Sequence, residues 1–348
     1  MPGAQHWVVV GLDNGGTSNN ATVLDDSGHF LVDRLVENAS FVTEGPDAAL
    51  DALSAALDNV LALTGTARSS VRAVGLDTPG PASADGVISS KGATNFSSPP
   101  WRGFDFRTAL ENRIQLPVIY NNDGNAAALY AHHKFFGDHA GAQSSVSAIV
   151  GTGLGGGVVV AGQVVTGTAG MAGELGHVHI PMAGLLAADQ PVPECNCGFA
   201  GDAESVASLK GIEKNLLPYW LARFPDHPLN AMGSIGQAAK MVRSYAEKQD
   251  ELALRIFEQQ AMALGRLFTI AANFTDPGAY FLGGGVVETT PQLRDWFLAT
   301  VRANTVLREE QERRTSLALV PDLDMAGARG SAIAALKSVR AVAELTLS

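Results

Sequence analysis

Short apolar runs alternate along the chain with longer segments whose apolar residues recur every three or four positions. The short runs are bounded by glycine, asparagine or aspartate, which predicts strands. The longer segments have helical spacing and predict amphipathic helices. Strands are predicted at 7–10, 21–24, 30–32, 71–76, 117–120, 146–150, 158–160, 279–282 and 317–320. Helices are predicted at 46–63, 106–112, 126–133, 203–217, 234–248, 250–274 and 331–345.

A glycine-rich turn separates two of the predicted strands, with five glycines in the seven positions from Gly151 to Gly157. Gly151, Gly153 and Gly156 match the dinucleotide-binding fingerprint, but that motif requires a helix to follow it. The next residues, Val158 to Val160, are β-branched and predict a strand, so the nicotinamide interpretation fails. Without a Cβ, backbone N–H groups can approach an anion closely. A purely structural hairpin would need only one or two glycines, so phosphate contact is favoured.

Two further glycine turns follow predicted strands. Gly15 and Gly16 lie between the first two strands and repeat the pattern seen at Gly151, which predicts two related halves that face one ligand. Gly283 to Gly285 form a third turn, against which a nucleoside could lie. Asp13 precedes the first turn, where its carboxylate could hold Mg²⁺ on a polyphosphate or act as an Asx-turn residue. The turn alone leaves both interpretations open.

Asn122 and Asp123 stand between a predicted strand and an alanine-rich helix. A carboxylate at the carboxyl end of a strand and beside a helix N-terminus is suited to accept a proton from a substrate hydroxyl. Asp123 could instead be the N-cap of the helix, and taken alone that role is the commoner one. The two predicted phosphate turns favour catalysis.

Composition limits the possible partners. The 348 residues are enough for two domains and a large core, and 46% hydrophobic with 17% charged residues is typical of a globular protein. The net charge of -11, without a cluster of Lys and Arg, argues against nucleic acid as a partner. The N-terminal segment has no basic flank and only a short apolar run, so neither a signal peptide nor a membrane span is predicted. We therefore expect a cytoplasmic protein.

The two cysteines, Cys195 and Cys197, are separated by one residue, which suits a metal better than a mutual disulfide. With His177 and Asp202 they would form a tetrahedral zinc site, and four protein ligands without an open position would make it structural. The alternative is a pair of buried free cysteines and a core histidine.

Six motifs, in this order and over nearly the whole chain, resemble those of the ROK family (repressor, open reading frame, kinase). They are DNGGT at 13–17, DTPGP at 77–81, NNDGNAA at 121–127, GTGLGGG at 151–157, GELGH at 173–177 and CNCGFAGDAE at 195–204. The resemblance implies an α/β, actin-like and ribonuclease-H-like ATPase fold of two domains with a cleft between them. The domains would be 1–122, on which a final helix at 331–348 packs back, and 123–330. It also implies a homodimer that phosphorylates a glucose-like aldohexose with ATP and Mg²⁺.

The resemblance assigns roles residue by residue. It implies that Asp123 is the general base and that His177 ligates zinc through its second ring nitrogen. The other sugar hydroxyls would be bound by Asn95, Asn122, Glu174, His177 and Glu204. The phosphates would be held by Asp13, Gly15, Gly16, Thr17, Gly151, Thr152, Gly153 and Gly155, and the adenosine side by Gly283, Gly284 and Gly285.

Three departures from the family pattern stand out. Asp202 takes the place of the third zinc cysteine, and the spacing from His177 to Cys195 is longer than usual. Asn19 and Asn20 replace apolar residues after the first phosphate turn. A catalytically silent sugar-binding or regulatory protein of the family is the alternative function. A DNA-binding regulator is disfavoured because the first predicted strand begins within ten residues. Polyphosphate as donor would require a basic groove that the sequence does not show.

Overall fold

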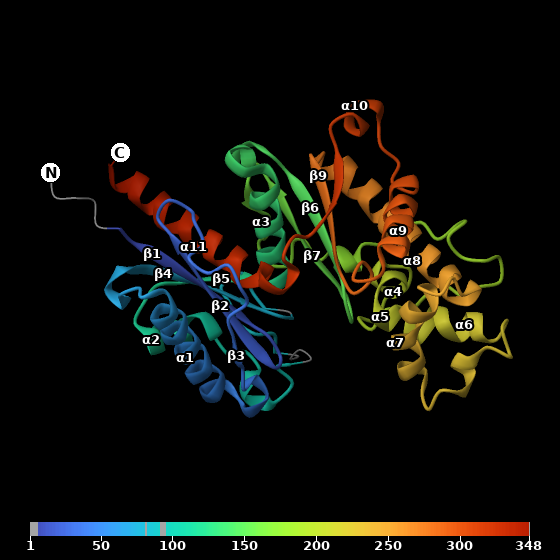
Figure 1. The fold of residues 1–348 in the computed structure, drawn as a ribbon, viewed down its shortest axis with the longest axis horizontal. Coiled ribbons are helices and arrows are strands. Elements are labelled where there is room, and N and C mark those ends of the chain that lie inside the picture. The colour runs from blue at the N-terminus through green and yellow to red at the C-terminus, as the bar shows by residue number, and fades with distance from the viewer. Residues whose placement is uncertain (1–5, 81, 91–94, 348) are drawn as a thin grey trace. The chain divides into compact units, whose positions relative to one another are not determined.

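The computed structural model describes residues 6–80, 82–90 and 95–347. Pro81 of the motif DTPGP and residues 91–94 of the following predicted loop lie outside the described residues. The chain forms two compact units, 1–141 with 157–173 and 320–348, and 142–156 with 174–319 (Figure 1). The unit boundaries differ from the predicted domain boundary at residue 122, because the helix that begins at Asp123 groups with the first unit.

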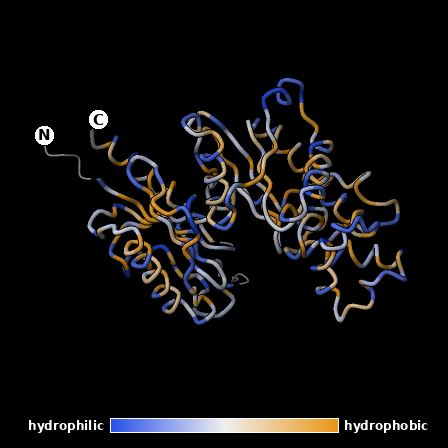
Figure 2. The backbone as a smooth tube through the Cα atoms, in the orientation of Figure 1, coloured by the Kyte–Doolittle hydropathy of each residue, from blue (hydrophilic) through white to orange (hydrophobic). Residues whose placement is uncertain are grey.

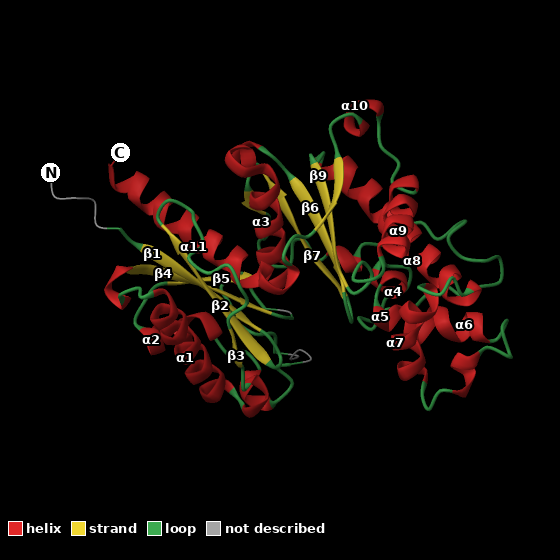
Figure 3. Ribbon diagram, viewed as in Figure 1, coloured by secondary structure: helices red, strands yellow, loops and turns green. Residues whose placement is uncertain are grey.

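The first unit is built on a five-stranded sheet of order β3-β2-β1-β4-β5 (Figure 3). β1 and β2 form an antiparallel hairpin, whereas β1, β4 and β5 run parallel, so their carboxyl ends meet at one edge. The predicted strand at 30–32 is absent: Phe30 forms one isolated bridge to Leu24, and β3 takes the edge. The strands are β1 Val8–Asn14, β2 Ser18–Asp25, β3 Glu37–Ala39, β4 Val71–Thr78 and β5 Val118–Asn122.

Helices cover both faces of this sheet. α1 (Pro46–Thr64) and α2 (Phe106–Ile114) lie on one face, and α11 (Leu323–Leu347) lies across the other beside α3 (Asp123–Phe136) (Figure 1). α1 forms where the sequence predicts it, because its apolar residues follow one stripe that is buried against the sheet. In Figure 2 the apolar residues follow the strands and the inner helix faces. Short 3₁₀ helices at Val42–Glu44, Arg68–Ser70, Pro99–Trp101 and Gly137–Ala142 complete the unit.

The final helix begins at Leu323 rather than at the predicted Ser331. The prediction took Gly330 as the helix start, but Gly327 and Gly330 lie inside α11. A Cβ on Gly330 would collide with the carbonyl oxygen of Ala126, and one on Gly327 would stand 2.9 Å from the carboxyl carbon of Asp13. These glycines therefore allow close packing and do not end the helix.

The second sheet has the order β10-β9-β6-β7-β8. β6 and β10 flank β9 in parallel, and β7 pairs with β8 in antiparallel fashion. The chain passes from one compact unit to the other within β7, so β8 groups with the first unit. The strands are β6 Ser145–Val150, β7 Leu154–Val160, β8 Gln163–Val164, β9 Ala279–Gly284 and β10 Ser316–Leu319.

Helices make up most of the second unit. The predicted helix at 203–217 is broken, because Ser208 is extended and its side chain caps a new helical turn at the N–H of Gly211, 2.9 Å away. The segment becomes α4 Glu204–Ala207, α5 Leu209–Gly211, a π-helix Ile212–Leu216 and α6 Leu217–Leu221. The others are α7 Ile235–Ala246, α8 Glu251–Thr275, α9 Pro291–Ala303 and α10 Glu309–Glu312, with 3₁₀ helices Leu175–His177 and Pro228–Ala231. Among the described residues, no helix combines the length and apolar character needed to cross a bilayer.

Candidate functional site

The first glycine turn joins β1 to β2 as predicted. The N–H of Gly15 donates to the carbonyl of Ser18 over 2.9 Å and closes the turn. The side-chain amide of Asn95 lies against Gly16 so closely that a Cβ there would stand 2.8 Å from Asn95 Oδ1. Thr17 is exposed, and its carbonyl accepts from Ser40 over 3.1 Å. The structure thus brings Asn95, predicted to bind sugar, onto the predicted phosphate turn.

Asp13 is the penultimate residue of β1 and lies opposite Asp77 of β4 in the parallel register. Its carboxylate accepts from the Asn20 amide over 3.2 Å, so it belongs to a strand and is not an Asx-turn residue. Asp77 is fully buried, and its Oδ2 accepts from the hydroxyl of Ser331 over 2.8 Å. The sequence identified Asp77 only as a motif letter and missed this carboxyl pair.

The two carboxyl groups lie close enough to change each other's pKa. Burial raises the pKa of Asp77 well above its usual value, and the nearby charge of Asp13 raises it further. Burial also raises the pKa of Asp13, although its hydrogen bond with Asp77 opposes that rise. Asp77 therefore holds its proton more strongly than Asp13 does, because two adjacent buried carboxylates cannot both be charged at low cost.

Asn122 and Asp123 take different roles at the start of α3. Asn122 is the N-cap, and its Oδ1 accepts from the N–H of Gly124 over 2.9 Å. Capping, the structural alternative for Asp123, therefore belongs to its neighbour. Asp123 is the first helical residue and is exposed, with Oδ1 2.7 Å from the same N–H. Its charge contributes to the raised pKa of Asp77, so the three acids lie at the same edge of the sheet.

The second glycine turn is shorter than predicted. Only Gly151 to Gly153 form it, closed by the N–H of Gly151 on the carbonyl of Gly153 at 2.9 Å. Gly155 to Gly157 belong to β7, where a Cβ on Gly156 would collide with the Ser147 carbonyl. Gly156 therefore serves close packing, whereas a Cβ on Gly155 would meet open space, and the sequence alone cannot distinguish the two.

A cavity of about 450 Å³ adjoins this turn within the second unit. Its size and largely apolar wall suit a small organic ligand such as a nucleoside. Of the predicted nucleotide residues, Gly151, Thr152 and Gly285 line it, whereas Gly283 and Gly284 are buried in β9. Arg243 of α7 also lines it and donates to the carbonyl of Gly285 over 2.8 Å. Other lining residues are Leu209, Ile212, Lys240, Phe257 and Gln260, which the sequence did not single out.

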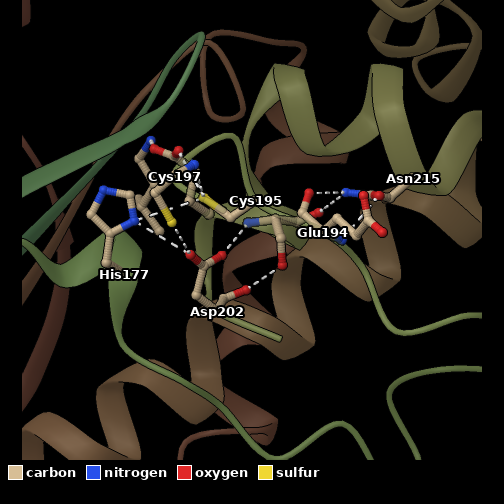
Figure 4. Close-up of polar contacts among 9 residues, drawn as sticks. His177, Glu194, Cys195, Cys197, Asp202 and Asn215 are labelled. Atoms are coloured by element: carbon tan, nitrogen blue, oxygen red, sulfur yellow. Dashed lines mark hydrogen bonds and ion pairs between the residues drawn. The ribbon is translucent and has the colours of Figure 1, made fainter. Parts of the chain in front are cut away.

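The predicted zinc residues converge. One ligand atom from each of His177, Cys195, Cys197 and Asp202 lies within 4.8 Å of all the others, and this is the one such group in the described part of the chain. His177 Nδ1 is 3.3 Å from Asp202 Oδ2 and 3.8 Å from Cys195 Sγ, and Cys197 Sγ is 3.7 Å from Asp202 Oδ2 (Figure 4). One nitrogen, two sulfurs and one oxygen form a donor set that fits tetrahedral Zn²⁺.

Other side chains hold in place the loop that carries Cys195, Cys197 and Asp202, which we call the metal loop. Asp202 is fully buried, and its Oδ1 accepts from the N–H of Ser205 over 2.8 Å, which leaves Oδ2 facing His177 and Cys197. Asn215, in the π-helix, accepts from the Glu194 N–H over 3.1 Å and donates to the Glu194 carbonyl over 3.0 Å (Figure 4). Asn215 thus fixes the residue before Cys195, a role for which the sequence carried no signal.

The acidic residues predicted to bind sugar lie next to the metal loop. Glu204 Oε2 accepts from the N–H of Leu154 over 2.8 Å, and its Oε1 is 3.6 Å from Cys195 Sγ. Although much of Glu174 is exposed, partial loss of water at its carboxyl raises its pKa, a rise that His177 opposes and Glu204 increases. The structure therefore brings Glu174, His177 and Glu204 together in the second unit.

Comparison with known proteins identifies the family to which the chain belongs. The family model "ROK family" matches residues 9–338. A glucokinase from Halalkalibacterium halodurans is 34% identical over 289 residues, which are 81% of each chain. The ROK hexokinase of Thermus thermophilus has a TM-score of 0.74 at 29% identity and covers 96% of this chain and 99% of its own. A ROK family glucokinase from Streptomyces griseus, solved with glucose and AMPPNP, has a TM-score of 0.66 at 28% identity over 95% and 99% of the two chains.

The chain belongs to the ROK family. The predicted actin-like α/β fold is confirmed.

Proposed function

We propose that the protein phosphorylates a glucose-like aldohexose with Mg-ATP. The chain is an ATP-dependent sugar kinase, a class supported by the glucokinase from Halalkalibacterium halodurans and by the neighbour that holds glucose and AMPPNP. The observation in this chain that carries the proposal is Asp123, an exposed carboxylate at the first turn of α3, with Asn122 taking the cap.

Asp123 accepts the proton of the attacking sugar hydroxyl. As that O–H bond breaks, the oxygen forms a bond to the γ-phosphorus, and the bond from phosphorus to ADP breaks. Phosphoryl transfer requires mainly positioning and neutralisation of charge, so one oriented base is sufficient protein chemistry. Within the first unit, Asn95 and Asn122 are the residues that we propose for contact with sugar hydroxyls. Within the second unit, Glu174, His177 and Glu204 are proposed for the same role.

Asp13 would hold Mg²⁺, directly or through water. Asp77 would position the Asp13 carboxylate. A carboxylate at the end of β1 beside the turn of Gly15 and Gly16 fits a hard cation that prefers oxygen ligands. Bound Mg²⁺ neutralises charge on the transferred phosphoryl group. Hydrogen bonding with Asp77 favours the ionised form of Asp13. The N–H groups of each glycine turn, taken separately, are suited to bind phosphate oxygens.

The cavity of the second unit receives the nucleoside. Its wall at Gly151 and Thr152 continues into the turn assigned to the phosphates, and Gly285, which follows the neighbouring strand β9, also lines it. By holding the Gly285 carbonyl, Arg243 fixes the chain after β9 against the bound base. ATP is the donor; the two basic lining residues, Lys240 and Arg243, do not form the long basic groove that polyphosphate would need.

Zinc has a structural role in this proposal. The four donors leave no open position, and Glu204 links the metal loop to Leu154 of β7. Zinc would thereby hold His177 and Glu204 in register with the turn of Gly151 to Gly153. A homodimer and a cytoplasmic location complete the prediction. A silent sugar-binding protein of the family is the alternative function, and turnover distinguishes the two.

The test is ADP release measured for glucose, mannose, fructose, N-acetylglucosamine and N-acetylmannosamine. Asp123→Asn is expected to lower kcat by about 10²–10⁴-fold while glucose binding persists, because only proton acceptance is removed. Asp138→Asn, an exposed acid of the same unit, is the matched control and keeps full turnover. Retained turnover in Asp123→Asn would remove Asp123 from the mechanism, and no turnover of any sugar by the wild type would favour the silent alternative.

A further inference from the structure

A second cavity, of about 460 Å³, lies within the first unit and has no part in the proposed reaction. α11 forms one side, and β5, α3 and β8 contribute Asn121, Leu129 and Gln163. Its volume is in the range of pockets that hold small organic ligands. The residues assigned above to phosphoryl transfer are absent from its wall.

Two cations of α11 face this cavity without acidic partners. Lys337 donates to the carbonyl of Gly162, and Arg340 donates to the carbonyl of Asp26 over 2.7 Å. Within the described residues neither forms an ion pair, although Glu344 also lines the cavity. Loss of water at Lys337 lowers its pKa, and no carboxylate offsets that loss. Uncompensated positive charge at a partly buried position favours an anion.

The wall also offers hydrogen-bond donors. The amide nitrogen of Asn121 is buried and has no partner in the structure. Ser338, one position after Lys337, and Gln163 of β8 add a hydroxyl and an amide to the same wall. The Asn121 nitrogen exposes almost no surface, so the donors that a ligand in the cavity can reach are the Ser338 hydroxyl and the Gln163 amide.

We propose that this cavity binds a phosphate-bearing small molecule of the size of a sugar phosphate. A phosphate presents several charged oxygens to the two cations and the amide and hydroxyl donors. The remaining volume, walled by Leu129 and Val164 among others, accommodates the body of the molecule. Inorganic phosphate and a hexose phosphate share this chemistry. Only the choice of a hexose phosphate rests on the proposed function.

The cavity is lined by residues of the strand and the helix that flank the proposed base, Asp123. Asn121 precedes Asp123 by two residues on the strand that leads into α3, and Leu129 belongs to α3 itself. A ligand in this cavity would therefore contact the strand and the helix on either side of Asp123.

The experiment is calorimetric titration of the full chain with inorganic phosphate and with glucose 6-phosphate, with glucose and AMPPNP present to fill the reaction site. The wild type is expected to bind both, and glucose 6-phosphate more tightly. The double variant Lys337→Gln/Arg340→Gln is expected to lose at least tenfold in affinity for both. Lys134→Gln, an exposed cation of α3, is the matched control and binds like the wild type.

A second variant shows whether a loss of binding in the double variant results from misfolding. Ser338→Leu removes a hydroxyl donor and places an apolar side chain in the wall while both cations stay in place, so it should also weaken binding. Circular dichroism and Tm report the fold. Unchanged phosphate affinity in the folded double variant, or no binding by the wild type, would overturn the proposal. Binding of inorganic phosphate alone would reject the hexose phosphate. Because the readout is binding, the phosphate site stands or falls independently of kinase turnover.

Discussion

The two glycine-turned hairpins use the same backbone device in different surroundings. The turn between β1 and β2 lies beside carboxylates and amides, namely Asp13, Asp77 and Asn95. The turn between β6 and β7 adjoins a largely apolar cavity and a metal loop that Glu204 ties to it. The first hairpin is therefore suited to a cation and proton chemistry, and the second to the body of a nucleotide.

The difference teaches that glycine turns alone do not define a phosphate site. In both hairpins the glycines leave room for neighbours: the Asn95 amide at Gly16 and the Glu204 carboxylate at Gly153. What each turn can bind depends on side chains that arrive from distant parts of the chain. Four experiments test this comparison.

Removing the charge of Asp13 is expected to have the largest effect. Asp13→Asn should lower kcat by about 10²–10³-fold because it removes the ligand that orients the charge-neutralising cation, while the fold persists. Steady-state kinetics over a range of Mg²⁺ concentrations would measure the loss. Asp25→Asn, at the opposite end of the same hairpin, is the control and should retain turnover. Equal losses in both variants would contradict a specific role for Asp13.

The metal loop of the second hairpin can be broken at Cys197. This cysteine is exposed, so Cys197→Ala would be nearly neutral if it were only a surface residue. As a zinc ligand it should reduce bound zinc from about one per chain toward zero and lower the Tm. Metal analysis by mass spectrometry together with thermal unfolding measures both. Wild-type protein that is purified without zinc would refute the ligand set.

Two adjacent glycines of β7 differ in the space around them, so substituting each one tests which of them is required for packing. Gly156→Ala places a Cβ into the carbonyl of Ser147 and should lower the free energy of unfolding by about 1–3 kcal/mol. Gly155→Ala points into open space and should leave stability within about 0.5 kcal/mol. Urea denaturation of both variants measures the contrast. Similar stabilities would show that the strand can shift to accept the methyl group.

Asp77→Asn tests the role of the buried carboxyl group beside the first hairpin through the pH dependence of stability. The folded state raises the pKa of Asp77, so between the unfolded and folded pKa values the native protein binds more protons and stability falls as pH rises. Asparagine keeps a donor to Asp13 without that penalty. The variant should therefore be more stable than the wild type by about 1–2 kcal/mol at neutral pH, and the gain should disappear below about pH 4.

Thermal unfolding at pH 4 and pH 7.5 measures this difference. Asp77→Ala, which removes the donor, should not show the same gain and serves as the comparison. A wild type whose stability relative to Asp77→Asn is independent of pH would contradict the raised pKa of Asp77.

Local pattern predicted much of the architecture because strand alternation and helical spacing are properties of short segments. α1, α7 and α8 appear where their apolar stripes predict them. The break of the helix predicted at 203–217 was missed, because Ser208 caps a new turn only when the chain there is already extended. Whether each predicted site residue performs its role stays a prediction.

The sequence by itself determined the family and the fold class and named candidate site residues whose roles stay predictions, because motif spacing and local periodicity are properties of consecutive residues. Only the tertiary structure showed that Asp77 lies buried opposite Asp13, that Asn122 and not Asp123 is the N-cap of α3, and that Lys337 lines a cavity. Burial and charge pairing arise when segments distant along the chain pack together, so no local pattern encodes them.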